Sequence, residues 1–424
     1  MRAIPSPSVY ASVEANVLRD GYNACLARIR LLDLRIGTMF AVRTNWDLTT
    51  NRLSEALERH RAAGKPVLDL TVSNPTDSGF VYDNNAILDA LRNPEALKYE
   101  PAPRGLVSAR RAVCEYYANH DASVDVDDMI LTTSTSEAYS YAFRLLCNPG
   151  EEILIPAPSY PLFDFLADIQ DVKLVRYPLI YDHGWQTDFH ALEQAITSRT
   201  RAVIVVNPNN PTGHFTKQME IEKLNALCTA RGLVLIVDEV FLDFSLEEKR
   251  APSFAKNRGA LTFTMSGLSK ICGLPQMKAA WLVVSGPEEL KREALARLEV
   301  IADTYLSMNA PVQLAVPSLL ALRRSFQELL MARVRRNLAE LDRQIAQQRV
   351  CSRLDVEGGW YAVLRVPATR SDEELALSLL NDHGVYVHPG HFFDFPSDGF
   401  LVASLISREE VFSEGFNRLV RNFH

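Results

Sequence analysis

The stretch SGLSKICGLPQMK holds two lysines, Lys270 and Lys278, between two apolar runs of the sequence. A lysine at a strand edge is commonly a solvated charge, but an amine in a partly enclosed apolar site is a nucleophile toward carbonyl compounds. Upstream, Asp238 ends the apolar run LVLIV, where a buried carboxylate needs a cation or a hydrogen-bond donor. A lysine or arginine would satisfy it structurally, and a protonated heterocyclic nitrogen of a ligand would satisfy it functionally. Lys278 fits either an anion ligand or a surface charge.

Three further loops carry side chains suited to ligand binding. Four consecutive hydroxyl residues, 133–136, precede a predicted helix, with Ser136 as the expected N-cap, and such a helix start is also an anion site. Tyr160 lies between two prolines after another apolar run, either as a packed turn or as a flat face for a stacked ring. The loop 207–213, NPNNPTG, is dense in turn residues and presents asparagine amides, of which Asn210 is one.

These loops follow a series of β-branched apolar runs, which predict the strands that position them. The expected strands are 129–134, 152–157, 172–179, 201–207, 233–240, 261–267 and 279–286. Amphipathic stretches between them, such as 136–147 and 216–232, predict helices, the second ending on Gly232. Alternation of this kind indicates an α/β fold with a mostly parallel, seven-stranded sheet. Since ligands bind beyond the carboxyl ends of such strands, the polar loops should meet there.

The texture of the sequence changes after residue 287, where long helical stretches are followed by a smaller α+β tail that ends in a helix over 407–423. We therefore expect residues 86–305 to form a large ligand-binding domain. Residues 47–85 and 306–424 should form a smaller α+β domain, and residues 1–46 an N-terminal arm without an assigned function.

Composition excludes several classes of function. A net charge of −7 favours neither nucleic acid nor an anionic membrane as a partner. No apolar stretch reaches the roughly 18 residues that a membrane helix needs. The six cysteines form no C-x-x-C pair, which indicates reduced thiols and a cytoplasmic protein, and no metal site is predicted.

The order of three motifs, VVNPNNPTG (205–213), LIVDEVFLDF (235–244) and SGLSKICGLPQMK (266–278), resembles the aminotransferase family of class I/II, fold type I, which uses pyridoxal phosphate. The resemblance extends over roughly residues 45–424 and implies a homodimer with active sites at the subunit interface. It implies that Lys270 holds the cofactor as a Schiff base and moves the proton, and that Asp238 pairs with the pyridine nitrogen.

The resemblance also implies roles for the remaining candidates. Asn210 would donate to the 3-hydroxyl oxygen of the cofactor, and Tyr160 would stack on its ring. The phosphate would be bound by Ser134, Thr135, Ser136, Lys278 and, from the neighbouring subunit, Tyr99 of KYEPAPRG (98–105).

Several positions depart from the family pattern. Phe241 stands where a tyrosine is usual, Lys278 replaces an arginine, Ser134 replaces a glycine, and Gly267 replaces a serine. In FLVASLI (400–406), Val402 takes the place of the arginine that clamps the substrate carboxylate. Another group must then bind that carboxylate, or the substrate is not an ordinary α-amino acid.

Arg43 and His391 are the two candidates for a substitute clamp. The leading hypothesis is an aminotransferase that exchanges an amino group between an amino acid or amine and a keto acid. The alternatives are a pyridoxal-phosphate-dependent lyase or decarboxylase on the same fold, and a catalytically silent ligand-binding protein.

Overall fold

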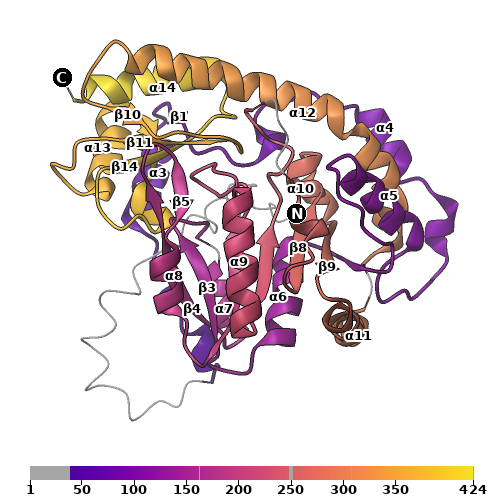
Figure 1. Cartoon of the computed structure of the whole chain (residues 1–424). Helices are drawn as coiled ribbons and strands as arrows, with labels where there is room; N and C mark the ends of the chain where they lie inside the picture. The colour runs from indigo at the N-terminus through magenta and orange to yellow at the C-terminus, as the bar shows by residue number, and fades with distance from the viewer. Residues whose placement is uncertain (1–38, 162, 248–251, 307, 424) are drawn as a thin grey trace.

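The computed structural model describes residues 39–161, 163–247, 252–306 and 308–423 (Figure 1). Its helices are α3 (Arg52–Ala62), α4 (Asn84–Ala90), α5 (Val107–Ala118), α6 (Thr135–Leu146), α7 (Phe163–Asp168), α8 (Phe189–Ala195), α9 (Gln218–Arg231), α10 (Leu268–Ile271), α11 (Glu288–Tyr305), α12 (Ala310–Ile345), α13 (Asp372–His383) and α14 (Glu409–Arg421). Short 3-10 helices are η1 (Val42–Thr44), η2 (Pro75–Asp77), η3 (Pro94–Leu97), η4 (Phe254–Lys256), η5 (Pro275–Met277) and η6 (Gly390–Phe393).

An eight-stranded sheet with the order β2-β9-β8-β7-β6-β3-β4-β5 forms the centre of the molecule. Its strands are β2 (Met129–Thr132), β3 (Glu152–Ala157), β4 (Lys173–Tyr181), β5 (Trp185–Thr187), β6 (Thr200–Val206), β7 (Val234–Asp238), β8 (Thr262–Gly267) and β9 (Ala280–Ser285). Neighbours from β4 to β8 are parallel, whereas β9 is antiparallel to both β2 and β8. All seven predicted strands are present. The eighth, β5, pairs antiparallel at the edge and is too short for a periodic pattern.

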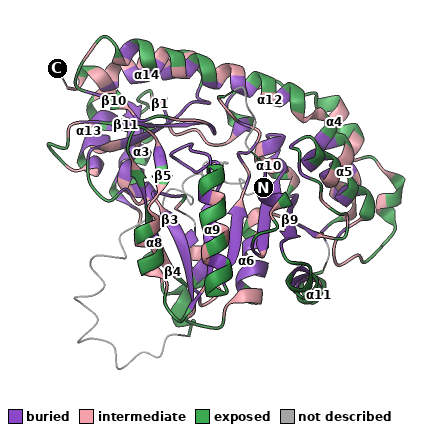
Figure 2. Cartoon of the chain, in the orientation of Figure 1, coloured by how far each residue is buried: buried purple, intermediate pink, exposed green. Residues whose placement is uncertain are grey.

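Both faces of this sheet are covered by helices, which is why its strands are buried on both sides (Figure 2). Apolar residues of α6, α7 and α11 pack on one face, and those of α8 and α9 on the other. The helix α9 ends at Gly232, which has the predicted left-handed backbone with φ of 63°. This layering confirms the predicted α/β class.

A second, four-stranded sheet with the order β10-β11-β14-β13 lies in the C-terminal part of the chain. It consists of β10 (Ser352–Arg353), β11 (Tyr361–Arg365), β13 (His388–Pro389) and β14 (Phe400–Ser404), all antiparallel. Nearby, β1 (Leu68–Asp69) pairs in parallel with β12 (Val385–Tyr386), so the segment before residue 85 does contact the C-terminal part. The domain boundaries given above stay a prediction.

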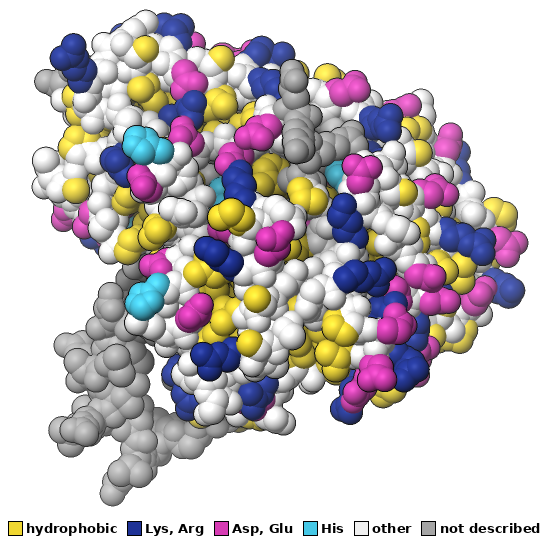
Figure 3. Space-filling model, viewed as in Figure 1, with side chains coloured by type: hydrophobic (Ala, Val, Ile, Leu, Met, Phe, Trp, Pro, Cys, Tyr) yellow, Lys and Arg dark blue, Asp and Glu magenta, His cyan; other side chains and the backbone are white. Residues whose placement is uncertain are grey.

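The 36-residue helix α12 runs past both sheets (Figure 1). Near α10, the Gln327 side-chain amide donates to the Ile271 carbonyl at 3.0 Å, and near β14 the Asn337 amide donates to the Leu405 carbonyl at 2.9 Å. The helix therefore links the two sheets through one part-buried and one buried hydrogen bond. None of the described helices is long and apolar enough to cross a membrane, and the face in Figure 3 carries interspersed charges of both signs.

Candidate active site

Strand register brings the polar loops to one edge of the central sheet. Asp238, the last residue of β7, lies opposite Val206 of β6 and Met265 of β8. At the other side of β8, Gly267 pairs with Ala280, which in turn pairs with Thr132 of β2. The loops after β2, β6, β7 and β8 and the loop before β9 thus leave the sheet at the same edge, as the sequence predicted.

Lys270 lies on the short helix α10, directly after β8. Its Nζ is 5.2 Å from the centre of the Trp360 ring and 5.9 Å from that of the Phe241 ring. The two rings meet edge to face, 4.7 Å apart. Lys270 is therefore only partly exposed and lies beside aromatic rings. This environment is more typical of a nucleophilic amine than of a lysine that is fully solvated.

The carboxylate of Asp238 accepts two hydrogen bonds. Oδ1 accepts from the Val240 backbone N–H at 3.0 Å, and Oδ2 accepts from the Tyr139 hydroxyl at 3.1 Å. Burial raises the pKa of Asp238 to about 6, against the opposing effect of both hydrogen bonds and of the nearby Lys270 charge. The carboxylate is thus held in place but remains costly to ionise until a further positive partner arrives. Sequence reasoning missed Tyr139, because it reads as an ordinary apolar position of α6.

The loop after β6 is buried and held by its own backbone. The Gly213 N–H donates to the Asn209 carbonyl at 2.8 Å, and Gly213 has the left-handed φ of 72° that favours glycine. The Asn209 side-chain N–H₂ donates to the Pro158 carbonyl at 3.3 Å, which ties this loop to the one carrying Tyr160. The Oδ1 atoms of Asn209 and Asn210 are buried without a hydrogen-bond partner. Two orphaned amide oxygens at a strand end are typical of a site that a ligand completes.

The helix α6 begins one residue after Ser134, not at the predicted N-cap Ser136. The Ser134 Oγ accepts from the Glu137 N–H at 3.1 Å, and the Glu137 carboxylate accepts from the Thr133 N–H at 2.6 Å. Together these two hydrogen bonds fix the start of the helix. Within the described residues, the N–H groups of Thr135 and Ser136 have no intramolecular acceptor, and they point along the helix axis as in anion sites.

Tyr160 and Lys278 both lie at this edge and are exposed. The Tyr160 ring is 38% exposed and contacts Phe163 edge to face. Lys278 lies two residues before β9, with a left-handed φ of 50°. Exposure at both positions leaves room for a ligand beside them.

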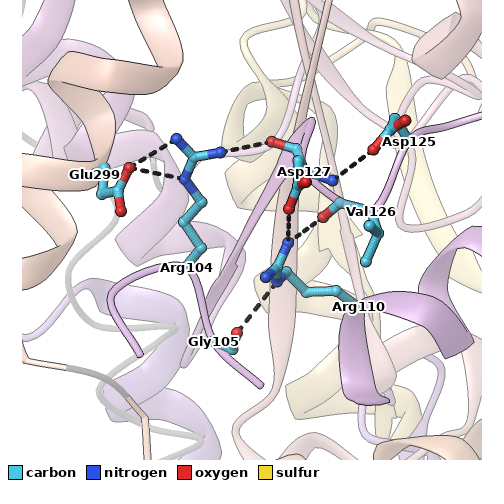
Figure 4. A network of polar contacts seen from close by, with 7 residues as sticks. All are labelled: Arg104, Gly105, Arg110, Asp125, Val126, Asp127 and Glu299. Atoms are coloured by element: carbon cyan, nitrogen blue, oxygen red, sulfur yellow. Dashed lines mark hydrogen bonds and ion pairs between the residues drawn. The ribbon is translucent and has the colours of Figure 1, made fainter. Parts of the chain in front are cut away.

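Tyr99 lies apart from these residues in the single chain and is 79% exposed. Its loop is nevertheless anchored (Figure 4): Arg104 donates to Glu299 of α11 at 2.7 Å and to the Asp127 carbonyl at 2.8 Å. Arg110 donates to the Gly105 carbonyl at 3.1 Å and contacts Asp127. An aromatic ring on an anchored loop that faces solvent is available to a second subunit.

Arg43 and His391, the two candidates for a substitute carboxylate clamp, lie in different parts of the molecule. Arg43 forms an ion pair with Asp171, which precedes β4 and so lies at the opposite edge of the sheet from Asp238. His391 lies on η6, where its ring contacts Phe392 edge to face at 4.9 Å. Within the chain, only His391 of these two is on the side of the molecule where Phe393 meets the loop of Tyr160, through its carbonyl and the Ser159 N–H at 2.9 Å.

A mostly parallel sheet with a lysine, an aspartate and an anion-binding helix start at its carboxyl edge is the arrangement of a fold type I enzyme. Comparison with known proteins agrees: the family aminotransferase class I and II matches residues 65–411. The chain belongs to this family.

Individual relatives cover most of the chain. It is 29% identical over 394 residues to the glutamate-pyruvate aminotransferase AlaA of Escherichia coli, spanning 89% of this chain and 96% of that one. It is 30% identical to the alanine aminotransferase of Mycobacterium tuberculosis, spanning 81% and 82%. Among solved structures, an aminotransferase from Escherichia coli superposes with a TM-score of 0.78 at 26% identity, covering 88% and 94%. Alanine aminotransferase from Pyrococcus furiosus shares the fold, with a TM-score of 0.80 at 23% identity over 87% and 95%.

The protein is accordingly a pyridoxal-phosphate-dependent aminotransferase. The residues fit this cofactor. Asp238 needs a positive partner, which a protonated pyridine nitrogen would supply, and the unpartnered Oδ1 of Asn210 could accept a hydrogen bond from the 3-hydroxyl group. The free N–H groups of Thr135 and Ser136 suit a phosphate. When bound, the cofactor acts as an electron sink and amino-group carrier.

Proposed function

We propose that Lys270 is the residue that attaches the cofactor and moves the proton of the transfer, and that Asp238 holds the cofactor ring through its nitrogen. The observation that carries this proposal is the buried Asp238 carboxylate, oriented by Tyr139 and close enough to Lys270 for the lysine charge to lower its pKa. Tyr139 is in this view a positioning residue.

The other contacts follow from the same edge of the sheet. We infer that Asn210 binds the 3-hydroxyl oxygen and Tyr160 lies on the ring. The phosphate contacts are assigned to Ser134, Thr135, Ser136 and Lys278. A lysine at position 278 supplies a point charge, where an arginine would supply a two-pronged contact.

We propose a homodimer in which Tyr99 of one subunit contacts the phosphate in the other. Support comes from its exposed ring on an anchored loop and from the exposed apolar Leu97 beside it. A cytoplasmic location is also proposed, supported by the five described cysteines, all of which are free.

The amino group is expected to pass between an amino acid or amine and a keto acid. Relatives named for alanine and for glutamate-pyruvate transfer favour this reaction over a lyase or decarboxylase. The test incubates the yellow holoenzyme with a panel of amino donors and follows the cofactor absorbance. Conversion to the amine form of the cofactor, reversed by a keto acid, supports transamination. Release of ammonia or carbon dioxide would contradict it, as would a Lys270→Ala variant with the same absorbance as the wild type.

A further inference from the structure

One face of the small sheet lies against the candidate site. Tyr361 begins β11, and its ring is 6.4 Å from that of Phe241, which is in turn 5.9 Å from the Lys270 Nζ. Because side chains alternate along a strand, Tyr361 and Val363 lie on the same face. This face is therefore the one that a substrate bound at Lys270 would meet.

The register of the small sheet places His388 on that face as well. Val363 of β11 is directly opposite Val402 of β14, and Val402 is directly opposite His388 of β13. Directly opposite residues have Cβ atoms about 4.5–5.5 Å apart on one face. The ring contacts agree, since the His388 ring is 5.8 Å from that of Phe393, which is 6.4 Å from that of Tyr361. His388 thus adjoins the position where the family pattern has its carboxylate-binding arginine.

The face carries no charge that would hold a carboxylate. Val402 is fully buried, and burial lowers the pKa of His388 to about 4, so the imidazole is neutral at pH 7. Of the described residues on this face, Arg365 is the one cation, and it lies at the far end of β11 over the Tyr181 ring. Arg176, which reaches the residue after η6, is held by Asp164 at 2.8 Å and Asp394 at 2.9 Å. A carboxylate here would be a buried charge without a partner.

A neutral imidazole offers one N–H donor and one nitrogen acceptor. The Nδ1 atom of His388 is buried and has no hydrogen-bond partner, so the ring is not committed to a structural contact through that atom. Its neighbours Phe392 and Phe393 fix the ring between aromatic faces. The side chain is therefore polar, oriented and uncharged, and it lies on the face of the small sheet whose Tyr361 meets Phe241 beside Lys270.

We propose that His388 determines substrate specificity, and that the selective substrate carries an uncharged hydroxymethyl, carbonyl or amide group on the reacting carbon in place of a carboxylate. This inference rests on the proposed function. The reaction balances without a further oxidant: the amine-bearing carbon of the donor becomes a carbonyl, the carbonyl carbon of the acceptor becomes an amine, and the nitrogen moves between them on the cofactor.

The test compares three donors that differ only in that group: L-alanine, L-alaninamide and L-alaninol. The half-reaction of each is followed by the cofactor absorbance in wild-type holoenzyme, His388→Phe, His388→Gln, Val402→Arg and Val402→Met. We expect kcat/KM for the two neutral donors to exceed that for L-alanine by about tenfold or more in the wild type. His388→Phe should lower this preference about tenfold, mainly through KM, and His388→Gln should retain it. Val402→Arg should invert the preference, whereas Val402→Met, which also lengthens the side chain but adds no charge, should not.

A wild type that prefers L-alanine by tenfold overturns the proposal, and so does a preference that His388→Phe leaves unchanged. Should Val402→Arg fail to fold, the His388 pair decides alone. A coloured enzyme that converts L-alanine best would retain the proposed function and refute only this inference. A protein that takes up no cofactor at Lys270 would instead count against the proposed function.

Discussion

Replacement of Tyr139 by phenylalanine tests whether the hydrogen bond to Asp238 controls cofactor binding. The Tyr139 hydroxyl donates to Oδ2 of a carboxylate whose pKa burial raises to about 6. A hydrogen bond to a charged group contributes about 1.5–3 kcal/mol, which corresponds to about one to two pKa units. Tyr139→Phe should therefore move the pKa of Asp238 from about 6 to between about 7 and 8. The ionised fraction at pH 7 would fall from about nine-tenths to about half or less.

The assay is a titration of cofactor-free protein with pyridoxal phosphate at several pH values, read by absorbance. Since only the ionised carboxylate pairs with a protonated ring nitrogen, the ratio of the Kd of Tyr139→Phe to that of the wild type should be about threefold or more at pH 6.5 and approach one near pH 9. Tyr141→Phe is the matched control: it loses a hydroxyl from the same helix, beside Glu137 and not beside Asp238. A Kd ratio for Tyr139→Phe that is the same at every pH would mean a packing effect and refute the reasoning.

Three further predictions follow from the site. Because the pKa of Asp238 is raised in the folded state, its contribution to stability is fully present below about pH 4 and is lost as pH rises through about 6. Asp238→Asn should therefore raise the unfolding free energy of the cofactor-free protein at pH 8 by at most about 3 kcal/mol relative to the wild type. The measurement is urea unfolding of both proteins at pH 8 and at pH 4. Phe241→Tyr should lower by about one to two units the pH at which the absorbance band of the bound cofactor shifts, because it adds a donor to an ionised oxygen; an unshifted titration contradicts this. Gly213→Ala should lower the unfolding free energy by about 1–3 kcal/mol, since φ is 72° and a Cβ would lie 2.5 Å from the Gly358 carbonyl oxygen; thermal melts compared with Gly150→Ala, where a Cβ meets nothing, separate the contact from the backbone strain.

Sequence reasoning reached the elements and residues whose signals are local. The run before Asp238, LVLIV, is a continuous apolar stretch that is typical of a strand covered on both faces, and the run before Lys270, LTFTM, is rich in β-branched and aromatic residues. Both residues lie at the predicted edge of the sheet. Tyr139, Trp360 and His388 were missed because each meets the site through tertiary packing across many residues of sequence. A tyrosine in an amphipathic helix looks apolar until a carboxylate is placed beside its hydroxyl.

Arg43 and Ser136 lie elsewhere in the chain's structure than their predicted roles require, and for related reasons. Arg43 had the right charge for a clamp, but its place is set by the ion pair with Asp171 at the other edge of the sheet, which sequence distance does not reveal. Ser136 has a hydroxyl suited to an N-cap, yet Ser134 takes that role, because its Oγ accepts from the Glu137 N–H while the Glu137 carboxylate accepts from the Thr133 N–H. When neighbouring residues have equal N-cap propensity, hydrogen-bond partners of this kind determine which of them becomes the N-cap.

The helix α12 fixes the distance between the helix that carries Lys270 and the small sheet. It is fixed to the Lys270 helix through Gln327 and to the end of β14 through Asn337, ten residues further along. At 1.5 Å per residue the two attachment points stand about 15 Å apart along a rigid axis. Adding or removing one residue between them would shift the small sheet by about 1.5 Å and turn it by about 100°, which neither set of contacts would survive. The spacing between α10, which carries Lys270, and the small sheet, which carries His388, is thus set by helical geometry in steps of one residue.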